Sequence, residues 1–598
     1  MRNLKPVILM LALLAPAPAA AQYRTLDDQF APPVFTSRAG WEARAAYLRE
    51  HILASAGLLP MPPKTPLHPV VFDETRHDGY SVWKVYFESI PGFYVTGNLY
   101  RPAGEGPFPA VISPHGHWAY GRLENSATGS LPGRAINLAR LGIVVFMPDM
   151  VGYNDSRQLP HTFGGPREHL WGLSLSGLQL WNNIRGLDFL QSLPYVRKDA
   201  IGATGASGGG SQTFLLAAVD ERVTVAAPVN MISLHMQGGC LCENIPGLRL
   251  DTTNVEIAAT IAPRPLLMVS ATGDWTKDTL EKEYPAVRAI YALMGADDRV
   301  SAVRFTAEHN YNKDSREAVY AWMARWLKGA PAQPRLEERA FSADKLQDLL
   351  VFHGRALPEG ALTREAFTAR WIDAAEQQLT ETSLSVRASA LRHALAFAAE
   401  TAAKPAGAVA RAGTAVRAPG RPSSRRQPVV LTAGDVAGAD AALRSAGFTV
   451  RAITFTPFNA EAAAKVNHFD TYNRTPASQR VADIVAALRT EPDAILVAAG
   501  DEALAGALAS AIEAPRLAIL DVKGFDTSRD EDFVSRLYMP GLRRAGDFQT
   551  AADMVPDRLV FHGTGEHFDV TGARIRRATL APADIVTVVR EELKRPKR

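Results

Sequence analysis

The pattern of apolar and polar positions changes along the chain, and each change predicts a different kind of structure. Residues 22–70 carry apolar side chains at helical spacing and end in a proline-rich stretch, which predicts a helical lead-in. From Tyr80 the alternation over 81–87 and 93–100 predicts two antiparallel strands. After Pro107 the strands become continuous apolar runs separated by helical patterns, which indicates a buried parallel sheet with right-handed crossovers.

The predicted strands of this sheet end at turns that are polar or rich in glycine. The strands are 110–113, 143–147, 201–204, 223–228, 266–271 and 303–305. Because the carboxyl ends of parallel strands meet at one edge of a sheet, reactive side chains are expected to gather there. The turns contribute, in chain order, His115 and His117, Asp149, Ser207, Asp274, and His309. The sequence therefore predicts a functional rim that is assembled from distant segments.

The turn after the third of these strands reads Gly205-Ala-Ser207-Gly-Gly209 and precedes a helical pattern. A serine at a tight strand-to-helix turn has a strained backbone that exposes its hydroxyl. The two glycines let strand and helix approach closely, and the helix N-terminus directs free N–H groups toward an oxyanion. We therefore predict that Ser207 is a nucleophile.

Such a serine needs a histidine base, and the histidine needs a carboxylate that fixes its tautomer. Asp274 and His309 supply these groups, each after a predicted strand, in the chain order Ser, Asp, His of the α/β-hydrolases. Asp278 lies four residues beyond the predicted acid and is an alternative to it. Glu243 and Asp251 are further alternatives, because some hydrolases take the acid from an earlier strand.

The same rim is expected to supply the oxyanion hole and the substrate contacts. An oxyanion hole needs two backbone donors. The N–H of Gly208 is one, and His117 or Trp118, in the turn after the first parallel strand, is expected to supply the other. The loop 229–262 is expected to cover the pocket. The candidate substrate contacts are His115, His235, Gln237, Glu243, Asn244 and Trp275.

We expect neither a metal nor another cofactor. The chain has two cysteines, Cys240 and Cys242, and lacks the second pair of a common zinc pattern. The His115-Gly-His117 sequence shows no third ligand in register. A disulfide between cysteines one residue apart is geometrically strained, so two small free side chains in a loop are the favoured interpretation, although export would permit a bridge.

Chain length and net charge limit the kind of protein, and the N-terminal sequence predicts where it is located. The chain has 598 residues, enough for several domains, and a net charge of +3 that implies no nucleic-acid partner. Arg2 and Lys5 precede the apolar run 7–15, and small residues end at Ala21. This pattern predicts a cleavable signal peptide over 1–21, and the run is too short for a membrane anchor. The mature protein is expected to be periplasmic or secreted.

Residues of about 40–330 resemble the bacterial α/β-hydrolase esterases grouped with acetyl xylan esterases, and more distantly the dienelactone hydrolases. The motifs that carry the resemblance are 91–102, Ser113-Pro-His-Gly-His-Trp118, Thr204-Gly-Ala-Ser-Gly-Gly209, Ser270-Ala-Thr-Gly-Asp274 and His309-Asn-Tyr311. The resemblance implies serine-dependent hydrolysis of carboxylic esters, such as acetyl groups on plant polysaccharide. Glucuronoyl esterases carry arginine where this chain has Gly208, and dienelactone hydrolases carry cysteine at the position of Ser207.

The second half is predicted to repeat the first. Ile245-Pro-Gly-Leu-Arg249 recurs as Met539-Pro-Gly-Leu-Arg543, and Asp199-Ala-Ile recurs as Asp493-Ala-Ile at the same separation. This offset favours tandem α/β-hydrolase domains. The second copy is expected to lack chemistry, because Asp501 takes the serine position and Thr432-Ala-Gly-Asp435 replaces the histidine turn, while Glu566, His468 and His567 have no serine to serve.

The predicted organisation has five parts. They are a signal peptide at 1–21, a helical lead-in at 22–79, a catalytic domain at 80–334, a helical segment and flexible linker at 335–427, and a degenerate domain at 428–598. The predicted function is an exported serine esterase whose substrate is a small or polysaccharide-linked ester. Two alternatives are a serine peptidase of the prolyl-oligopeptidase type, which usually carries a preceding β-propeller, and a non-catalytic binding protein.

Overall fold

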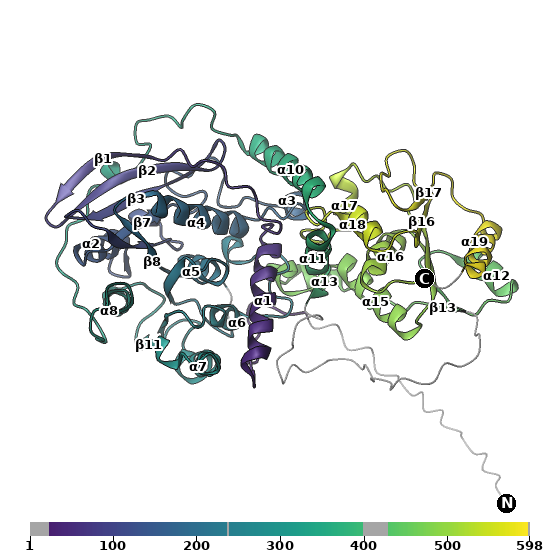
Figure 1. Ribbon diagram of the computed structural model, residues 1–598, viewed down its shortest axis with the longest axis horizontal. Coiled ribbons are helices and arrows are strands. Elements are labelled where there is room, and N and C mark those ends of the chain that lie inside the picture. Colours follow the sequence, from purple (N-terminus) through teal and green to yellow (C-terminus); the bar gives the residue numbers. More distant parts are fainter. Residues whose placement is uncertain (1–22, 236–237, 399–427, 596–598) are drawn as a thin grey trace, which may run out of the picture.

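The computed structural model describes residues 23–235, 238–398 and 428–595, and it contains two large sheets with helices between them (Figure 1). The predicted signal peptide at 1–21, the substrate contact proposed at Gln237 and the linker at 404–427 lie outside the described residues. No helix among the described residues has the length and apolar character needed to cross a membrane.

The first sheet has nine strands in the order β1-β2-β3-β7-β4-β8-β9-β10-β11. Strands β1 to β3 are antiparallel, β3 pairs antiparallel with β7, and the six strands from β7 to β11 in that order are parallel. The strands are β1 (Val70–His77), β2 (Tyr80–Ile90), β3 (Phe93–Pro102), β4 (Phe108–Ile112), β7 (Val144–Pro148), β8 (Val196–Ala206), β9 (Val223–Val229), β10 (Leu266–Ala271) and β11 (Val300–Phe305). A small hairpin, β5 (Asn125–Ser126) and β6 (Gly129–Ser130), lies apart from this sheet.

The sheet begins earlier than the sequence pattern predicts. Strand β1 belongs to it, so the helical lead-in does not extend to residue 79 as expected. This edge strand is largely exposed, and its pairing with β2 shifts register between Phe72 and Thr75, where Asp73 has φ 51°. A bulge interrupts the two-residue period, which removes the alternation that would have identified the strand.

Helices cover both faces of the parallel region. Ile112 and Phe146 pack in the cluster that contains α4 and α5, whereas Val111 and Val145 pack in the cluster that contains α2 and α8. The helices of this half are α1 (Arg38–Ser55), α2 (Leu131–Arg140), α3 (Pro166–Leu170), α4 (Leu175–Ser192), α5 (Gly208–Val219), α6 (Asn254–Ala259), α7 (Tyr284–Leu293) and α8 (Lys313–Lys328). Strands buried on both faces explain the continuous apolar runs in the sequence.

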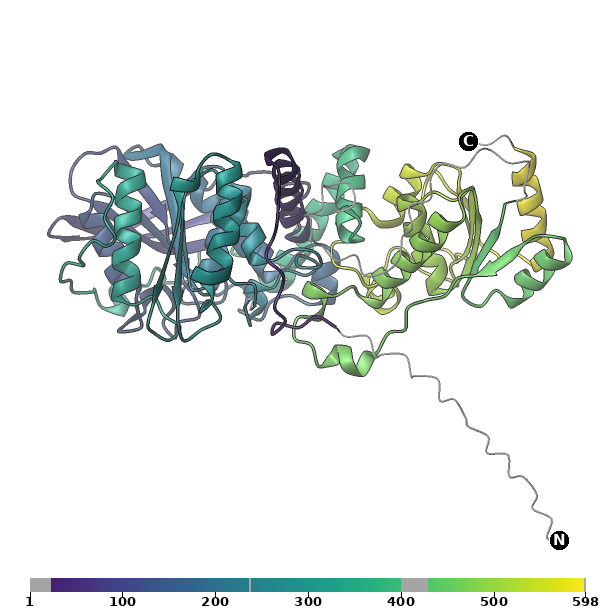
Figure 2. The same ribbon diagram turned by 90° about the horizontal axis from the view of Figure 1, so that it is seen from below.

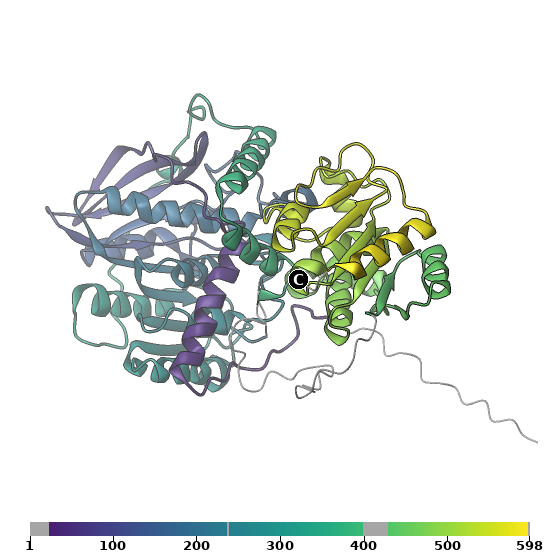
Figure 3. The same ribbon diagram turned by 45° about the vertical axis from the view of Figure 1, so that its right-hand side comes forward.

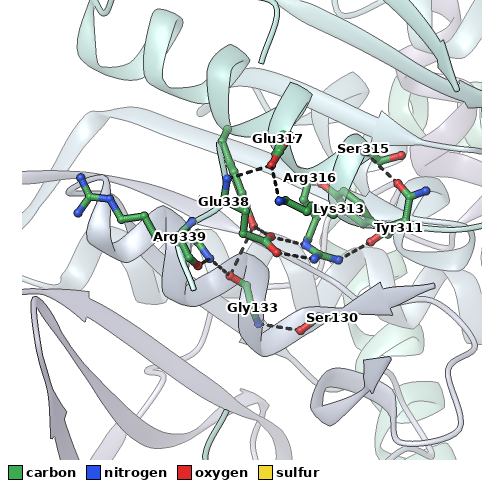
Figure 4. A network of polar contacts seen from close by, with 12 residues as sticks. Ser130, Gly133, Tyr311, Lys313, Ser315, Arg316, Glu317, Glu338 and Arg339 are labelled. Carbon is green, nitrogen blue, oxygen red and sulfur yellow. Dashed lines mark hydrogen bonds and ion pairs between the residues drawn. The ribbon is translucent and has the colours of Figure 1, made fainter. Parts of the chain in front are cut away.

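A buried ion pair fastens the start of α8 to the chain that follows it. The Arg316 guanidinium lies 2.6 Å from the Glu338 carboxylate, and both side chains are buried (Figure 4). Nη1 of Arg316 also donates to the carbonyl of Tyr311 at 3.0 Å. Tyr311 lies two residues after His309, so this pair restrains the loop that carries the predicted base.

The second sheet has six parallel strands in the order β13-β12-β14-β15-β16-β17. They are β12 (Val430–Ala433), β13 (Val450–Ala452), β14 (Ile495–Ala499), β15 (Leu517–Asp521), β16 (Leu559–His562) and β17 (Arg574–Arg576). Its helices are α12 (Ala437–Ser445), α13 (Ala460–Ala464), α14 (Phe469–Tyr472), α15 (Pro476–Thr490), α16 (Asp501–Ile512), α17 (Asp530–Arg536), α18 (Asp547–Met554) and α19 (Pro582–Lys594). In chain order, the strand arrangement equals that of the six parallel strands of the first sheet.

The two sheets are joined by a packed interface. Helices α1, α10 (Arg364–Glu381) and α11 (Leu384–Ala394) lie between them, as Figures 2 and 3 show from two sides, and the short α9 (Leu346–Leu349) precedes α10. One continuous cluster of buried apolar side chains includes members from both halves. The halves therefore share a core.

Candidate active site

Ser207 sits at the junction of β8 and α5 with φ 56° and ψ −125°, a left-handed conformation that is strained for serine. Its N–H donates to the carbonyl of Val229 at 3.2 Å. A Cβ atom at Gly205 would lie 2.5 Å from the Gly209 carbonyl oxygen, and one at Gly209 would lie 2.5 Å from that of Pro114. The close approach of β8 and α5 thus requires Gly205, and the close approach of α5 to the turn after β4 requires Gly209.

Asp274 follows β10 and meets His309, which follows β11. Oδ2 of Asp274 lies 2.8 Å from Nδ1 of His309, and the aspartate side chain is only 2% exposed. The other carboxylate oxygen, Oδ1, accepts hydrogen bonds from the N–H and the hydroxyl of Thr276. The carboxylate is therefore fixed from both sides and can hold the imidazole in one tautomer.

The alternative acids are engaged elsewhere. Asp278 pairs with Lys282 at 2.8 Å on the surface, and Asp251 pairs with Arg44 at 2.9 Å. Glu243 accepts a hydrogen bond from a loop N–H through Oε2. Of these four carboxylates, Asp274 is the one that hydrogen-bonds to His309 in the described structure, because it follows the strand next to the histidine strand.

The second ring nitrogen of His309, Nε2, is left free to exchange a proton. The Trp275 ring lies against the imidazole, with ring centroids 4.4 Å apart. Within the described part of the chain, Nε2 of His309 is a buried atom without a hydrogen-bond partner. This nitrogen is opposite the Asp274 contact and is the atom that could take a proton from a serine or return it to a leaving group.

Two contacts bring the histidine loop to the serine rim. The Thr204 hydroxyl lies 2.7 Å from the Tyr311 hydroxyl, and Nδ2 of Asn230 donates to the carbonyl of Asn310 at 3.1 Å. Asn230 directly follows Val229, the acceptor for the Ser207 N–H. Strands β8, β9, β10 and β11 are parallel neighbours, so the turns that carry Ser207, Asp274 and His309 lie at one edge.

The structure distinguishes the two proposed oxyanion donors of the first turn. The Trp118 N–H donates to the carbonyl of Gly116 at 2.9 Å, so the prediction of Trp118 as a free donor is wrong. A Cβ at Gly116 would lie 3.1 Å from the Cβ of Ser207, which places this turn beside the nucleophile. His117 therefore remains as the candidate partner of Gly208, which opens α5.

Two predicted substrate contacts are wrong because their side chains are buried and fully used. His115 contacts the carbonyl of Gly116 through Nδ1 and accepts from the Met150 N–H through Nε2, and burial lowers its pKa to about 3. Asn244 donates to two loop carbonyls and accepts from the Tyr472 hydroxyl at 2.9 Å. Both residues hold the chain rather than offer a polar group to a ligand.

The remaining substrate contacts stay predictions. Trp275 lies at the rim through its contact with His309, and His235 is partly buried in the loop after β9. Glu243 is buried, which raises the pKa of its carboxyl, and Oε1 lies 3.6 Å from the position of a Cβ at Gly208. Glu243 thus faces the start of α5 from the loop that was expected to cover the pocket.

A cluster of histidines and cysteines lies beside the turn that carries Ser207, and it was not expected from the sequence. Ligand-type atoms of His117, His161, Cys240 and Cys242 all lie within 4.8 Å of one another. Both cysteines are free thiols, as favoured by their spacing. Hydrogen bonds with Cys242, His117 and His161 hold the pKa of the Cys240 thiol far below its ordinary value. Sequence reasoning missed His161, because it lies in a turn with no recognisable ligand spacing.

The corresponding turn of the second sheet lacks a nucleophile. Gly500, between β14 and α16, has φ 72° and ψ −140°, close to the values at Ser207, and its N–H donates to the carbonyl of Asp521. The residue with the backbone conformation of Ser207 is therefore Gly500, and Asp501, which was predicted to take the serine position, is the residue after it. A glycine carries the strained turn without offering a hydroxyl.

No family model matches the chain. A curated protein of Bacillus subtilis (strain 168), "Putative hydrolase YtaP", is 28% identical over 242 residues, which cover 37% of this chain and 80% of that protein. A solved structure of Methylesterase BT1017 is 29% identical, with a TM-score of 0.48, and covers 58% of this chain and 78% of that chain. An acetyl xylan esterase from Paenibacillus sp. R4 is 18% identical, with a TM-score of 0.34, and covers 50% and 98%.

The strand order of the first sheet, with a serine turn after β8, an aspartate after β10 and a histidine after β11, is that of the α/β-hydrolase fold. The chain is similar to a hydrolase in sequence, and the solved structures that resemble it include acetyl xylan esterases and a methylesterase.

Proposed function

We propose that the protein is an exported serine carboxylic-ester hydrolase that acts on carbohydrate-linked esters through Ser207, His309 and Asp274. The observation that carries the proposal is the 2.8 Å contact between His309 and Asp274 at the same sheet edge as the strained turn of Ser207. The sequence resemblance to acetyl xylan esterases favours an acetylated sugar as substrate, and the predicted signal peptide over residues 1–21 favours export.

The proposed reaction has two stages, acylation of Ser207 and hydrolysis of the acyl-enzyme. Nε2 of His309 accepts the Ser207 proton as Oγ attacks the ester carbonyl, and Asp274 stabilises the resulting imidazolium. The N–H groups of Gly208 and His117 stabilise the oxyanion. The imidazolium then protonates the leaving alcohol, which leaves an acyl group on Ser207. Water deprotonated by His309 attacks the acyl-enzyme and releases the acid.

The direct test compares wild-type protein with Ser207→Ala on a short aryl ester. Loss of the nucleophile should lower kcat at least about a thousandfold, because the histidine and aspartate cannot act without it. Ser211→Ala is a matched control, since Ser211 is buried one turn along α5 and has no role in the proposed reaction. Equal activity of wild type and Ser207→Ala would refute the nucleophile.

The substrate class is tested on three natural linkages side by side. Acetylated xylan, a methyl-esterified uronic acid polymer and a proline-containing peptide distinguish an acetyl esterase, a methylesterase and a peptidase. We expect release of acetate from the first. Cleavage of the peptide alone would favour the peptidase alternative. If neither these three substrates nor the aryl ester is hydrolysed, a binding protein would be favoured.

We further propose that the second sheet is a degenerate copy of the hydrolase domain. Its strand order equals that of the six parallel strands of the first sheet, and Gly500 has the backbone conformation of Ser207. The interface also supports the proposal through two pairs of corresponding hydrogen bonds. The N–H groups of Gly247 and Arg249 donate to carbonyls of Asp470 and Thr471, and those of Gly541 and Arg543 donate to His169 and Leu170.

A further inference from the structure

The cluster of His117, His161, Cys240 and Cys242 is assembled from three loops around the proposed active site. His117 comes from the turn after β4, His161 from the turn after β7, and the cysteines from the loop after β9. Side chains this far apart in the sequence do not meet as a consequence of local structure. Four ligand-type groups at one point therefore need an explanation of their own.

Two of the distances between these atoms match those of a tetrahedral coordination shell. A zinc ion with imidazole and thiolate ligands separates two nitrogens by about 3.3 Å and a nitrogen from a sulfur by about 3.6 Å. Nε2 of His161 lies 3.3 Å from Nε2 of His117 and 3.5 Å from Sγ of Cys240. Nε2 of His117 lies 3.0 Å from Sγ of Cys242, slightly inside this geometry.

The surroundings orient these groups as ligands. Nδ1 of His161 lies 2.7 Å from the carbonyl of Val151, and donation to that oxygen leaves Nε2 as the lone-pair nitrogen directed at the cluster. Such a contact to a backbone carbonyl is the usual second-shell partner of a metal-bound histidine. The Cys240 N–H donates to Glu243 at 3.1 Å, which fixes the cysteine loop.

We propose that His117, His161, Cys240 and Cys242 bind a single transition-metal ion, zinc by the character of its ligands, beside the nucleophile turn. Two thiolates and two imidazoles form a closed four-ligand set that suits Zn²⁺ and leaves no position for a substrate water. The ion therefore organises loops rather than carrying out hydrolysis.

The location gives the ion a specific effect on the rim. Cε1 of His117 lies 3.0 Å from the position of a Cβ at Gly208, so the coordinated ring packs against the residue that follows Ser207. Binding would fasten the turn after β4 to the loop after β9. An effect of the metal on turnover rests on the proposed function, since the turn after β4 carries the His117 N–H that is proposed to stabilise the oxyanion. Metal binding itself does not depend on the proposed function.

The test measures metal on the full chain, independently of ester hydrolysis. Protein produced in zinc-supplemented medium and purified under reducing conditions should contain about one zinc per chain by elemental analysis. Cys240→Ser, Cys242→Ser and His161→Ala should each reduce the content to near background. His68→Ala is the matched control. The His68 side chain is 68% exposed just before the edge strand β1, so this variant should retain the metal.

Metal-free protein titrated with Co²⁺ alone gives a second readout. Tetrahedral thiolate coordination predicts intense visible d–d absorption together with a sulfur-to-cobalt charge-transfer band, and the charge-transfer band should fall in either cysteine variant. Circular dichroism identifies any variant that fails to fold. Less than a tenth of an equivalent of bound zinc after reconstitution, an octahedral cobalt spectrum, or a Cys240–Cys242 disulfide in the reduced preparation would overturn the proposal.

Discussion

At the residue scale, the proposed chemistry depends on how one carboxylate is held. Asp274 is 2% exposed and accepts from Thr276 on one oxygen and faces His309 on the other. The Thr276 contacts were not predicted, because hydroxyl side chains two residues after an acid are common in turns. The choice of Asp274 over Asp278 followed from strand position, which local sequence does specify.

Replacing this carboxylate gives a prediction with a close control. Asp274→Asn should lower kcat on a short aryl ester by about a thousandfold or more, because an amide no longer fixes the histidine tautomer or stabilises the imidazolium. Asp278→Asn, four residues away and paired with Lys282 on the surface, should change kcat by less than about threefold. Equal losses in the two variants would remove Asp274 from the mechanism.

His51 gives a prediction about pH at the junction of the halves. Burial, aided by His393, whose Nδ1 lies 3.0 Å from Nδ1 of His51, lowers its pKa to about 4. Arg44 opposes its protonation and Asp251 favours it. Below about pH 6.5 this histidine is protonated in the unfolded chain but stays neutral in the folded protein. The free energy of unfolding therefore falls as the pH drops toward 4, and His51 contributes up to about 3 kcal/mol to this loss.

The measurement is urea unfolding at pH 7 and at pH 4.5 for the wild type and His51→Gln. The variant removes the titrating group, so its free energy of unfolding should fall less between the two values. The same loss in both proteins would show that His51 does not contribute to the pH dependence.

At the element scale, the parallel strands and the turns after them follow closely from the sequence. Predicted strands 223–228 and 266–271 correspond to β9 (Val223–Val229) and β10 (Leu266–Ala271), because continuous apolar runs mark strands buried on both faces. Strand β1 was missed, since a bulge and an exposed edge erase its alternation. Side-chain roles were harder, because burial decides them: His115 and Asn244 look free in sequence and are enclosed in the structure.

The serine turn predicts a sharp cost for a single methyl group. Gly205→Ala would place Cβ 2.5 Å from the backbone oxygen of Gly209, which no side-chain rotation relieves. We expect a loss of about 3 kcal/mol or more in stability, or failure to fold. Gly438→Ala in the first turn of α12 meets only the Pro582 ring at 3.3 Å and should be neutral or slightly stabilising. Similar shifts of the thermal unfolding midpoint in both variants would contradict this assignment.

At the scale of the whole molecule, two sheets share one apolar core and a hydrogen-bonded interface. The motif Ile245–Arg249 and its counterpart Met539–Arg543 both lie at this interface, each donating backbone N–H groups to the opposite half. The repeat noticed in the sequence thus coincides with equivalent contacts. Its position at the interface could not be inferred from sequence, because short matches carry no information about which surfaces meet.

The interface also has a cavity of about 590 Å³ at the carboxyl end of the second sheet. Tyr23, Phe458 and Tyr472 line it together with Arg480 and Glu502, which opens α16 beside Gly500. The rim of the first sheet that carries Ser207 and this cavity occupy corresponding edges of two sheets with the same strand order.

The central claim, that distant segments converge to activate one serine, is tested most directly by covalent trapping. Wild-type protein treated with a fluorophosphonate should gain a single adduct, which peptide mass spectrometry places on Ser207. His309→Ala should label far more slowly, and Ser207→Ala should not label. A fully folded wild-type protein that stays unmodified, or an adduct that persists in Ser207→Ala, would contradict the account.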